Sequence, residues 1–132
     1  MNYLIDTHIL LWWCLDRPQL LGPHDKILLD IESHEETVGL SIISFWEIAK
    51  LVAMKRYDLA RPIDKWFDEM EQHPNLKILP LTGKIILDST RLGPHFPKDP
   101  ADQLIAATAR CHGLRLMTAD DRIIQSKVVA IA

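Results

Sequence analysis

The chain has 132 residues, 48% of them hydrophobic and 25% charged, which predicts one compact domain over residues 1–132 with a sizeable buried core. Its longest apolar run, residues 9–15, is far shorter than the roughly 20 residues that cross a bilayer, and no signal peptide is expected. Cys14 and Cys111 are isolated and have no zinc-like spacing. We therefore expect free thiols, a cytoplasmic protein and no membrane association.

The net charge of −3 argues against binding nucleic acid by bulk electrostatic attraction. That argument weakens if a metal neutralises part of the negative charge. Without the five acids discussed below, the remaining residues carry +2. Such a surface is compatible with a polyanion around a cation-filled pocket.

Apolar runs alternate with segments of helical period, a pattern typical of βαβ units around a parallel sheet. From the N-terminus we expect a strand at 3–5, a helix at 7–15, a helix at 24–33, a strand at 37–42, helices at 44–55 and 62–72, a strand at 76–79 and a helix at 82–92. A loop at 93–97 is followed by a helix at 100–111, a strand at 115–117, a short helix at 120–125 and a last strand at 128–130.

Acidic residues stand at the start of four predicted helices: Asp6, Glu47, Asp99 with Asp102, and Asp120 with Asp121. Each has a plain structural explanation. An aspartate at a helix N-cap accepts a hydrogen bond from a free backbone N–H, as expected for Asp6, Asp99 and Asp120. Ser44-Phe-Trp-Glu47 has the spacing of a capping box, in which Glu47 would bond back to the cap.

Capping gives no reason for so many acids to converge. Right-handed crossovers between parallel strands bring the strand-to-helix junctions to one edge of the sheet. Carboxylates gathered there repel one another and raise one another's pKa unless a cation is present. A set without His or Cys suits a hard ion, Mg²⁺ or Mn²⁺. The sequence therefore predicts a metal pocket lined by Asp6, Glu47, Asp99, Asp102 and Asp120.

Other interpretations stay open. His8 either supports the neighbouring Asp6 or has only a structural role. The sequence contains no apparent catalytic triad and no glycine-rich phosphate loop. A receiver-like signalling domain would need an acid at the end of its central strand, where this chain has Leu79-Pro80-Leu81. A catalytically silent binding module whose acids only cap helices, and a DNA-directed nuclease, are the remaining alternatives.

Four stretches resemble the PIN-domain family, in particular the VapC-type toxin ribonucleases of toxin–antitoxin pairs. They are residues 3–12 (YLIDTHILLW), 41–50 (SIISFWEIAK), 98–107 (KDPADQLIAA) and 116–120 (LMTAD). They follow the family's order and span nearly the whole chain. The resemblance implies a three-layer αβα sandwich around a mainly parallel sheet of four to five strands.

By this resemblance, Asp6, Glu47 and Asp102 match the core metal-binding acids and Asp120 matches a more variable fourth acid. Asp99 matches an additional acid of a subgroup that carries an Asp-Pro-x-Asp block. Gln103 departs from that subgroup, which often has Arg there, and this puts a basic substrate contact at the position in doubt.

The implied activity is hydrolysis of RNA phosphodiester bonds by metal-activated water. The acids expected to be catalytic are Asp6, Glu47, Asp102 and Asp120, with Asp99 adjusting a second metal site. The residues expected to position substrate or water are Thr7, Thr118, Lys50 and Lys98. The resemblance also implies a small antitoxin that occludes the site, and frequent homodimerisation.

Overall fold

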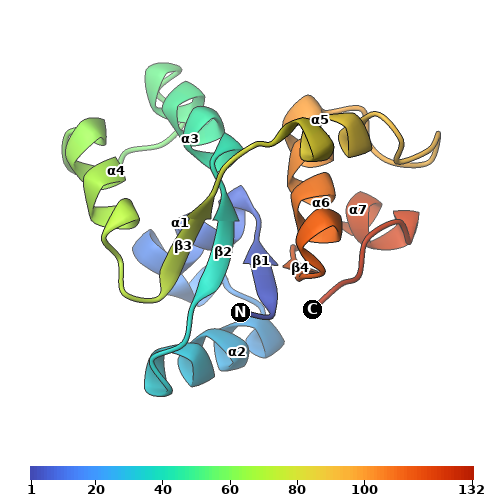
Figure 1. The fold of residues 1–132 in the computed structure, drawn as a ribbon. Coiled ribbons are helices and arrows are strands. Elements are labelled where there is room, and N and C mark those ends of the chain that lie inside the picture. The colour runs from blue at the N-terminus through green and yellow to red at the C-terminus, as the bar shows by residue number, and fades with distance from the viewer.

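The computed structural model describes residues 1–132 and contains a four-stranded, all-parallel sheet between two layers of helices (Figure 1). The strands are β1 (Tyr3–Ile5), β2 (Val38–Ser41), β3 (Leu76–Leu79) and β4 (Arg115–Met117), in the order β3-β2-β1-β4. The helices are α1 (Thr7–Leu15), α2 (Gly22–Ser33), α3 (Ile43–Ala53), α4 (Ile63–Glu71), α5 (Gly83–Ser89), α6 (Pro100–His112) and α7 (Asp121–Ser126). A short 3₁₀ turn, η1 (Arg17–Gln19), follows α1.

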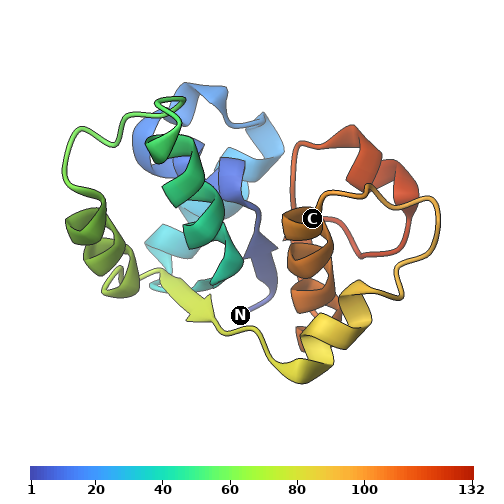
Figure 2. The same ribbon diagram turned by 90° about the horizontal axis from the view of Figure 1, so that it is seen from above.

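Two hydrophobic cores lie on the two faces of the sheet, because successive side chains of a strand point in opposite directions. In β1, Ile5 belongs to the core formed with α1 to α4, and Leu4 belongs to the core formed with α6 and α7. Figure 2 shows α1 to α4 on one side of the sheet and α5 to α7 on the other. The predicted α/β sandwich is confirmed, with four strands. No helix is long and apolar enough to cross a membrane.

Aspartate side chains begin three helices, as the sequence predicts. Asp6 Oδ1 accepts a hydrogen bond from Ile9 N (3.0 Å) at the start of α1. Asp99 caps α6 through Asp102 N (3.1 Å). Asp120 begins α7 in the same way. Each of these carboxylates is therefore fixed at the first turn of its helix.

The predicted capping box at α3 is wrong. The helix begins at Ile43, one residue earlier than expected, and Ile42 is its N-cap without any side-chain hydrogen bond. Ser44 is fully buried inside the first turn. The Glu47 carboxylate accepts a hydrogen bond from Thr7 Oγ1 of α1 and makes none to its own helix. Glu47 therefore caps no helix, and neither does the side chain of Asp102, whose backbone N–H bonds to the Asp99 cap.

The predicted strand at 128–130 is also wrong. Only a single bridge, between Leu116 and Ile131, joins this segment to β4. Lys127 has a φ of 58°, so the backbone turns immediately before the segment and no ladder develops. Val129 is buried in the core formed with α6 and α7, and this burial accounts for the apolar pattern from which a strand was predicted.

The order of the strands places a crevice after β1. The chain proceeds from β1 to β2 and β3 on one side, whereas β4 pairs with the other edge of β1. Asp6 N donates to Met117 O (3.1 Å), which holds the ends of these two strands together. Ligand sites in open α/β sheets lie at the carboxyl ends of strands at such a reversal.

Gly39 of β2 allows close packing in the second core. A Cβ there would lie 3.0 Å from Leu79 Cδ1 and 3.1 Å from Leu4 Cδ1. We expect Gly39→Val to lower the free energy of unfolding by about 1–3 kcal/mol, because a branched side chain overfills this space. Urea unfolding measures the change. The control is Gly22→Ala, where no heavy atom lies within 4 Å. Equal stability of Gly39→Val and the natural chain would contradict the packing.

Candidate metal centre

An acidic cavity of about 400 Å³ opens at the carboxyl ends of β1 and β4. Acids from four different junctions line it together with one arginine, and these residues are Asp6, Glu47, Asp99, Asp102, Asp120 and Arg122. The remaining lining residues are Thr7, His8, Trp12, Ile105 and Ala119. The structure therefore brings together all five acids that the sequence singled out.

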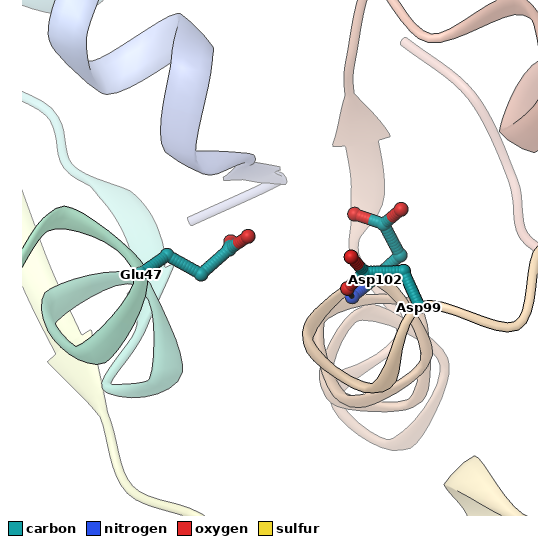
Figure 3. Close-up of side chains that lie close together, drawn as sticks. All are labelled: Glu47, Asp99 and Asp102. Carbon is teal, nitrogen blue, oxygen red and sulfur yellow. Dashed lines mark hydrogen bonds between the residues drawn. The ribbon is translucent and has the colours of Figure 1, made fainter. Parts of the chain in front are cut away.

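The tightest group is formed by Glu47, Asp99 and Asp102. One carboxylate oxygen from each lies within 4.8 Å of the other two. Figure 3 shows Glu47 reaching from α3 toward the two aspartates at the start of α6. Oxygens on opposite sides of one divalent cation lie roughly 4–5 Å apart, since each metal–oxygen bond is about 2.0–2.6 Å. The spacing therefore fits a single shared cation.

Asp6 lies deeper and is held by both carboxylate oxygens. Its Oδ1 caps α1, and its Oδ2 accepts a short hydrogen bond from Thr118 Oγ1, at the end of β4. The Thr118 hydroxyl also accepts a hydrogen bond from Asp120 N (3.1 Å). Burial raises the pKa of Asp6, although these hydrogen bonds act in the opposite direction.

Glu47 is fixed by a buried pair of hydroxyls. Thr7 Oγ1 bonds the Glu47 carboxylate and lies 2.9 Å from Ser44 Oγ. Burial raises the pKa of Glu47, and repulsion from Asp99 and Asp6 adds to this, whereas the bond from Thr7 lowers it. Thr7 and Thr118, expected to position water or phosphate, are thus in direct contact with carboxylates.

Asp102 is the acid that the cavity disturbs most clearly. Burial, followed by repulsion from Asp99, Glu47, Asp120 and Asp6, raises the pKa of Asp102 to about 7. All of these causes favour the protonated form. A divalent cation in the cavity would reverse them, because it compensates the repulsion between the carboxylates.

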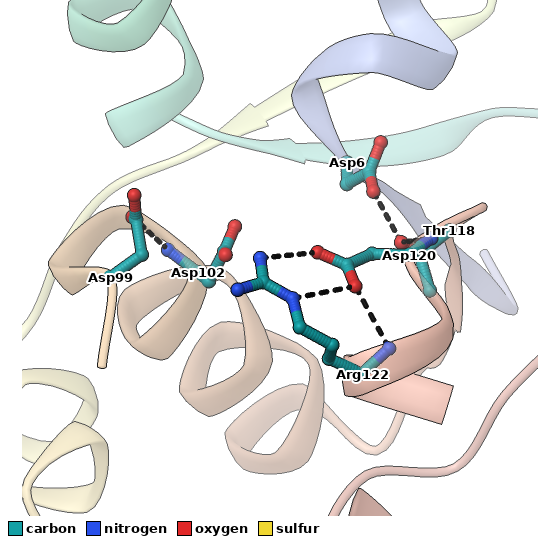
Figure 4. A network of polar contacts seen from close by, with 6 residues as sticks. All are labelled: Asp6, Asp99, Asp102, Thr118, Asp120 and Arg122. Carbon is teal, nitrogen blue, oxygen red and sulfur yellow. Dashed lines mark hydrogen bonds and ion pairs between the residues drawn. The ribbon is translucent and has the colours of Figure 1, made fainter. Parts of the chain in front are cut away.

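Asp120 has its own counter-ion, which the sequence reading missed. Arg122 Nε and Nη2 contact the two oxygens of Asp120 at 3.4 and 3.2 Å, and Figure 4 shows the guanidinium between Asp120 and Asp102. Burial alone would raise the pKa of Asp120, but the bonds from Arg122 outweigh it and lower that pKa. An arginine two residues after an N-cap acid was the signal available in the sequence.

The two lysines expected to meet the RNA backbone are placed differently. Lys50 Nζ lies 4.1 Å from the centroid of the Trp46 ring and lines a second cavity next to the acidic one. Lys98 is exposed in the loop before α6 and lines neither cavity. His8 is exposed and lines both.

The donor set fits a hard divalent cation. Its potential ligands are carboxylate oxygens from separate elements, and the buried carboxylates lack enough positive charge nearby to balance them. Two of them are locked by threonine hydroxyls, which is how proteins commonly orient metal-binding groups.

Removing the Asp102 charge should stabilise the metal-free chain. The pKa of Asp102 in the folded chain, about 7, exceeds the ordinary value of an aspartate. The charged Asp102 carboxylate therefore destabilises the fold fully above pH 7, and this destabilisation fades as pH falls toward 4. In EDTA at pH 8 we expect Asp102→Asn to raise the free energy of unfolding by on the order of 1 kcal/mol, after discounting for solvent screening. The gain should shrink at pH 5. Urea unfolding at both pH values tests this, with the exposed Asp68→Asn as control. A variant no more stable than the natural chain at pH 8 would refute the repulsion.

The Thr118 hydroxyl should hold Asp6 in its charged form. Thr118→Val keeps the shape but removes the donor to Asp6 Oδ2. We expect the pKa of Asp6 to rise further and the free energy of unfolding to fall by about 1–2 kcal/mol. Carboxyl ¹³C NMR titration and urea unfolding measure the two effects. Thr118→Ser, which retains the hydroxyl, should behave like the natural chain; identical loss in both variants would point to packing alone.

Comparison with known proteins identifies the family. A family model described as the PIN domain matches residues 3–129. Ribonuclease VapC22 of Mycobacterium tuberculosis (strain ATCC 25618 / H37Rv) is 33% identical over 120 residues, which cover 91% of this chain and 88% of that protein.

Solved structures show the same fold at lower identity. The VapBC2 structure from Rickettsia felis, bound to a promoter DNA fragment, gives a TM-score of 0.68 at 16% identity, covering 100% of this chain and 98% of that one. FitAcB from Neisseria gonorrhoeae gives 0.66 at 23%, covering 98% and 95%. A toxin–antitoxin complex from Klebsiella pneumoniae gives 0.65 at 22%, covering 98% and 96%. With the family model matching nearly its whole length, this chain belongs to the PIN-domain family.

Proposed function

We propose that this protein is a metal-dependent endoribonuclease and the toxin of a toxin–antitoxin pair. The observation that carries the proposal is the convergence of five carboxylates, from the N-terminal ends of four helices, in one cavity. The similarity to ribonuclease VapC22 supports RNA as the substrate, because it extends over 91% of the chain. Helix capping alone would leave the carboxylates of Glu47 and Asp102, which cap nothing, without a role.

Glu47, Asp99 and Asp102 would hold one Mg²⁺ or Mn²⁺, with Asp6 and Asp120 completing the site or holding a second ion. When bound, such a cation supplies a Lewis acid that polarises the phosphoryl oxygens and lowers the pKa of water. Thr118 and Ile9 N keep Asp6 in one orientation, and Thr7 does the same for Glu47. The carboxylates therefore need little rearrangement when RNA arrives.

Positive side chains at the rim would receive the RNA backbone. Arg122 is the only arginine or lysine that lines the acidic cavity, and its side chain is 72% exposed. It can therefore contact a phosphate without being desolvated first. Lys50 lines the adjoining second cavity, and Lys98 is exposed in the loop before α6. These three residues are proposed as substrate contacts.

The proposed partner is a small antitoxin that covers the acidic cavity. Structures of the same fold include VapBC2 from Rickettsia felis and the toxin–antitoxin complex from Klebsiella pneumoniae. We further propose a homodimer that acts in the cytoplasm, where the free thiols of Cys14 and Cys111 would stay reduced. Light scattering during gel filtration measures the oligomeric state.

Cleavage should require the acids and a divalent cation. Purified protein incubated with a mixed RNA pool should give discrete fragments with Mg²⁺ or Mn²⁺ and none in EDTA. We expect Asp6→Asn and Glu47→Gln to slow cleavage on the order of 100-fold or more, because each removes a charge at the reacting centre. Asp68→Asn, an exposed acid outside the cavity, serves as the matched control.

Each alternative has its own signature in the same experiment. A silent binding module would cleave nothing and would gain no thermal stability from Mg²⁺. A DNA-directed nuclease would cleave a DNA pool of matching sequences faster than the RNA. Full RNA cleavage by Asp6→Asn would contradict the proposed role of the acids.

A further inference from the structure

A second cavity, of about 360 Å³, adjoins the acidic one. The two share His8, Glu47 and Asp99 as lining residues. Figure 3 shows Glu47 and Asp99 facing each other from α3 and α6, the helices that flank this place. Any ligand in the second cavity therefore lies directly beside the acids.

Trp46 forms one wall of this cavity and is unusually exposed. Its exposed fraction is 48%, whereas Trp66 is fully buried and Trp13 is 8% exposed. The neighbouring core residues of α3, Phe45 and Ile48, face inward, so helical geometry turns Trp46 outward. An exposed indole presents a flat, polarisable surface on which another ring can stack.

The cations of the second cavity are not engaged by acids. Neither Lys50 nor Arg56 forms an ion pair. Glu47 precedes Lys50 by three residues, a spacing at which opposite charges often pair on a helix. Here the bond from Thr7 holds Glu47 toward the acidic cavity, and Lys50 lies 4.1 Å from the Trp46 ring centroid instead. Arg56 is thus available to an incoming anion, and Lys50 is available once a ligand replaces its ammonium over the Trp46 ring.

We propose that the second cavity binds an unpaired nucleotide of single-stranded RNA next to the bond that is cleaved, an inference that rests on the ribonuclease function proposed above. The base stacks on Trp46 and takes the place of the Lys50 ammonium over the ring, and the phosphates contact Lys50 and Arg56. Aromatic platforms combined with basic side chains are the usual means of holding single strands. A regular duplex cannot use this cavity, because its bases are already paired and stacked.

A protein segment is the competing occupant of Trp46, since the indole also borders an apolar cavity with Ile43, Leu81 and Leu104. The observations favour RNA for the second cavity. Its two cations, Lys50 and Arg56, form no ion pair and complement a polyanion, whereas its acids, Glu47 and Asp99, lie on the border that it shares with the acidic cavity. It also opens directly onto Glu47 and Asp99, so a single strand bound at the acids can extend into it.

The experiment measures RNA binding without cleavage, in an Asp6→Asn background with Mg²⁺ present. Fluorescence anisotropy compares a labelled single-stranded RNA pool with a blunt RNA duplex. We expect Trp46→Ala to weaken single-strand binding roughly ten-fold and to leave duplex binding unchanged. Trp46→Phe, which keeps an aromatic face, should retain most of the affinity. Leu29→Ala, at an exposed position on α2, is the matched control. RNA should also quench the tryptophan fluorescence, and this quenching should shrink in Trp46→Phe.

Equal single-strand affinity in Trp46→Ala and its parent would overturn the proposal and leave Trp46 to a protein partner. An equal loss on single strands and duplex would overturn it as well, since stacking would not be the cause. The ribonuclease proposal fails separately, if the natural chain does not cleave RNA in Mg²⁺. Selective loss of single-strand binding would still support the nucleotide subsite in that case.

Discussion

Electrostatic repulsion among five carboxylates is the constraint around which this structure is organised. Asp102 shows its effect most directly, because burial and four neighbouring acids raise its pKa to about 7. The fold tolerates this through many small contacts. Helix N-termini stabilise Asp6, Asp99 and Asp120, and threonine hydroxyls hold Asp6 and Glu47. A cavity arranged in this way favours a divalent cation, because no other group nearby offers enough positive charge.

Capping and the proposed metal binding can use the same residues without conflict. A carboxylate has two oxygens, and a cap engages only one of them. Asp99 Oδ1 accepts from Asp102 N, so its second oxygen can turn toward the cavity. The helix start then fixes the position of the oxygen that would face the proposed metal. The structural and the functional interpretation of the aspartates are therefore two consequences of one geometry.

Short-range patterns predicted much of the fold. The sequence was sufficient to predict β1, β3 and β4 and the caps at Asp6 and Asp99, because these depend on apolar runs and local hydrogen bonding. The segment at 128–130 has the same apolar pattern as a strand, but the turn at Lys127 confines its pairing to one bridge. Such a distinction depends on the backbone around the segment, which residue type does not reveal.

The site was predictable in its acids but not in their partners. Parallel topology alone brings strand-to-helix junctions to one edge, and the structure agrees in placing Asp6, Glu47 and Asp120 around one cavity. Glu47 had a local explanation as a capping residue, whereas its real partner, Thr7, lies 40 residues away. The exposed Trp46 platform was equally hidden, because a tryptophan in an apolar helix normally indicates core.

The two walls of the acidic cavity differ in charge balance, and a cation is therefore attracted more strongly to one wall than to the other. On one wall, Asp120 is already paired with Arg122, which lowers its pKa. On the other, Glu47 and Asp102 have raised pKa values and form no ion pair. A cation entering the cavity therefore gains more at the second wall, beside Asp99, than at Asp120. That wall also borders the cavity of Trp46 and Lys50, so the strongest attraction for metal and the proposed seat of the RNA base lie side by side.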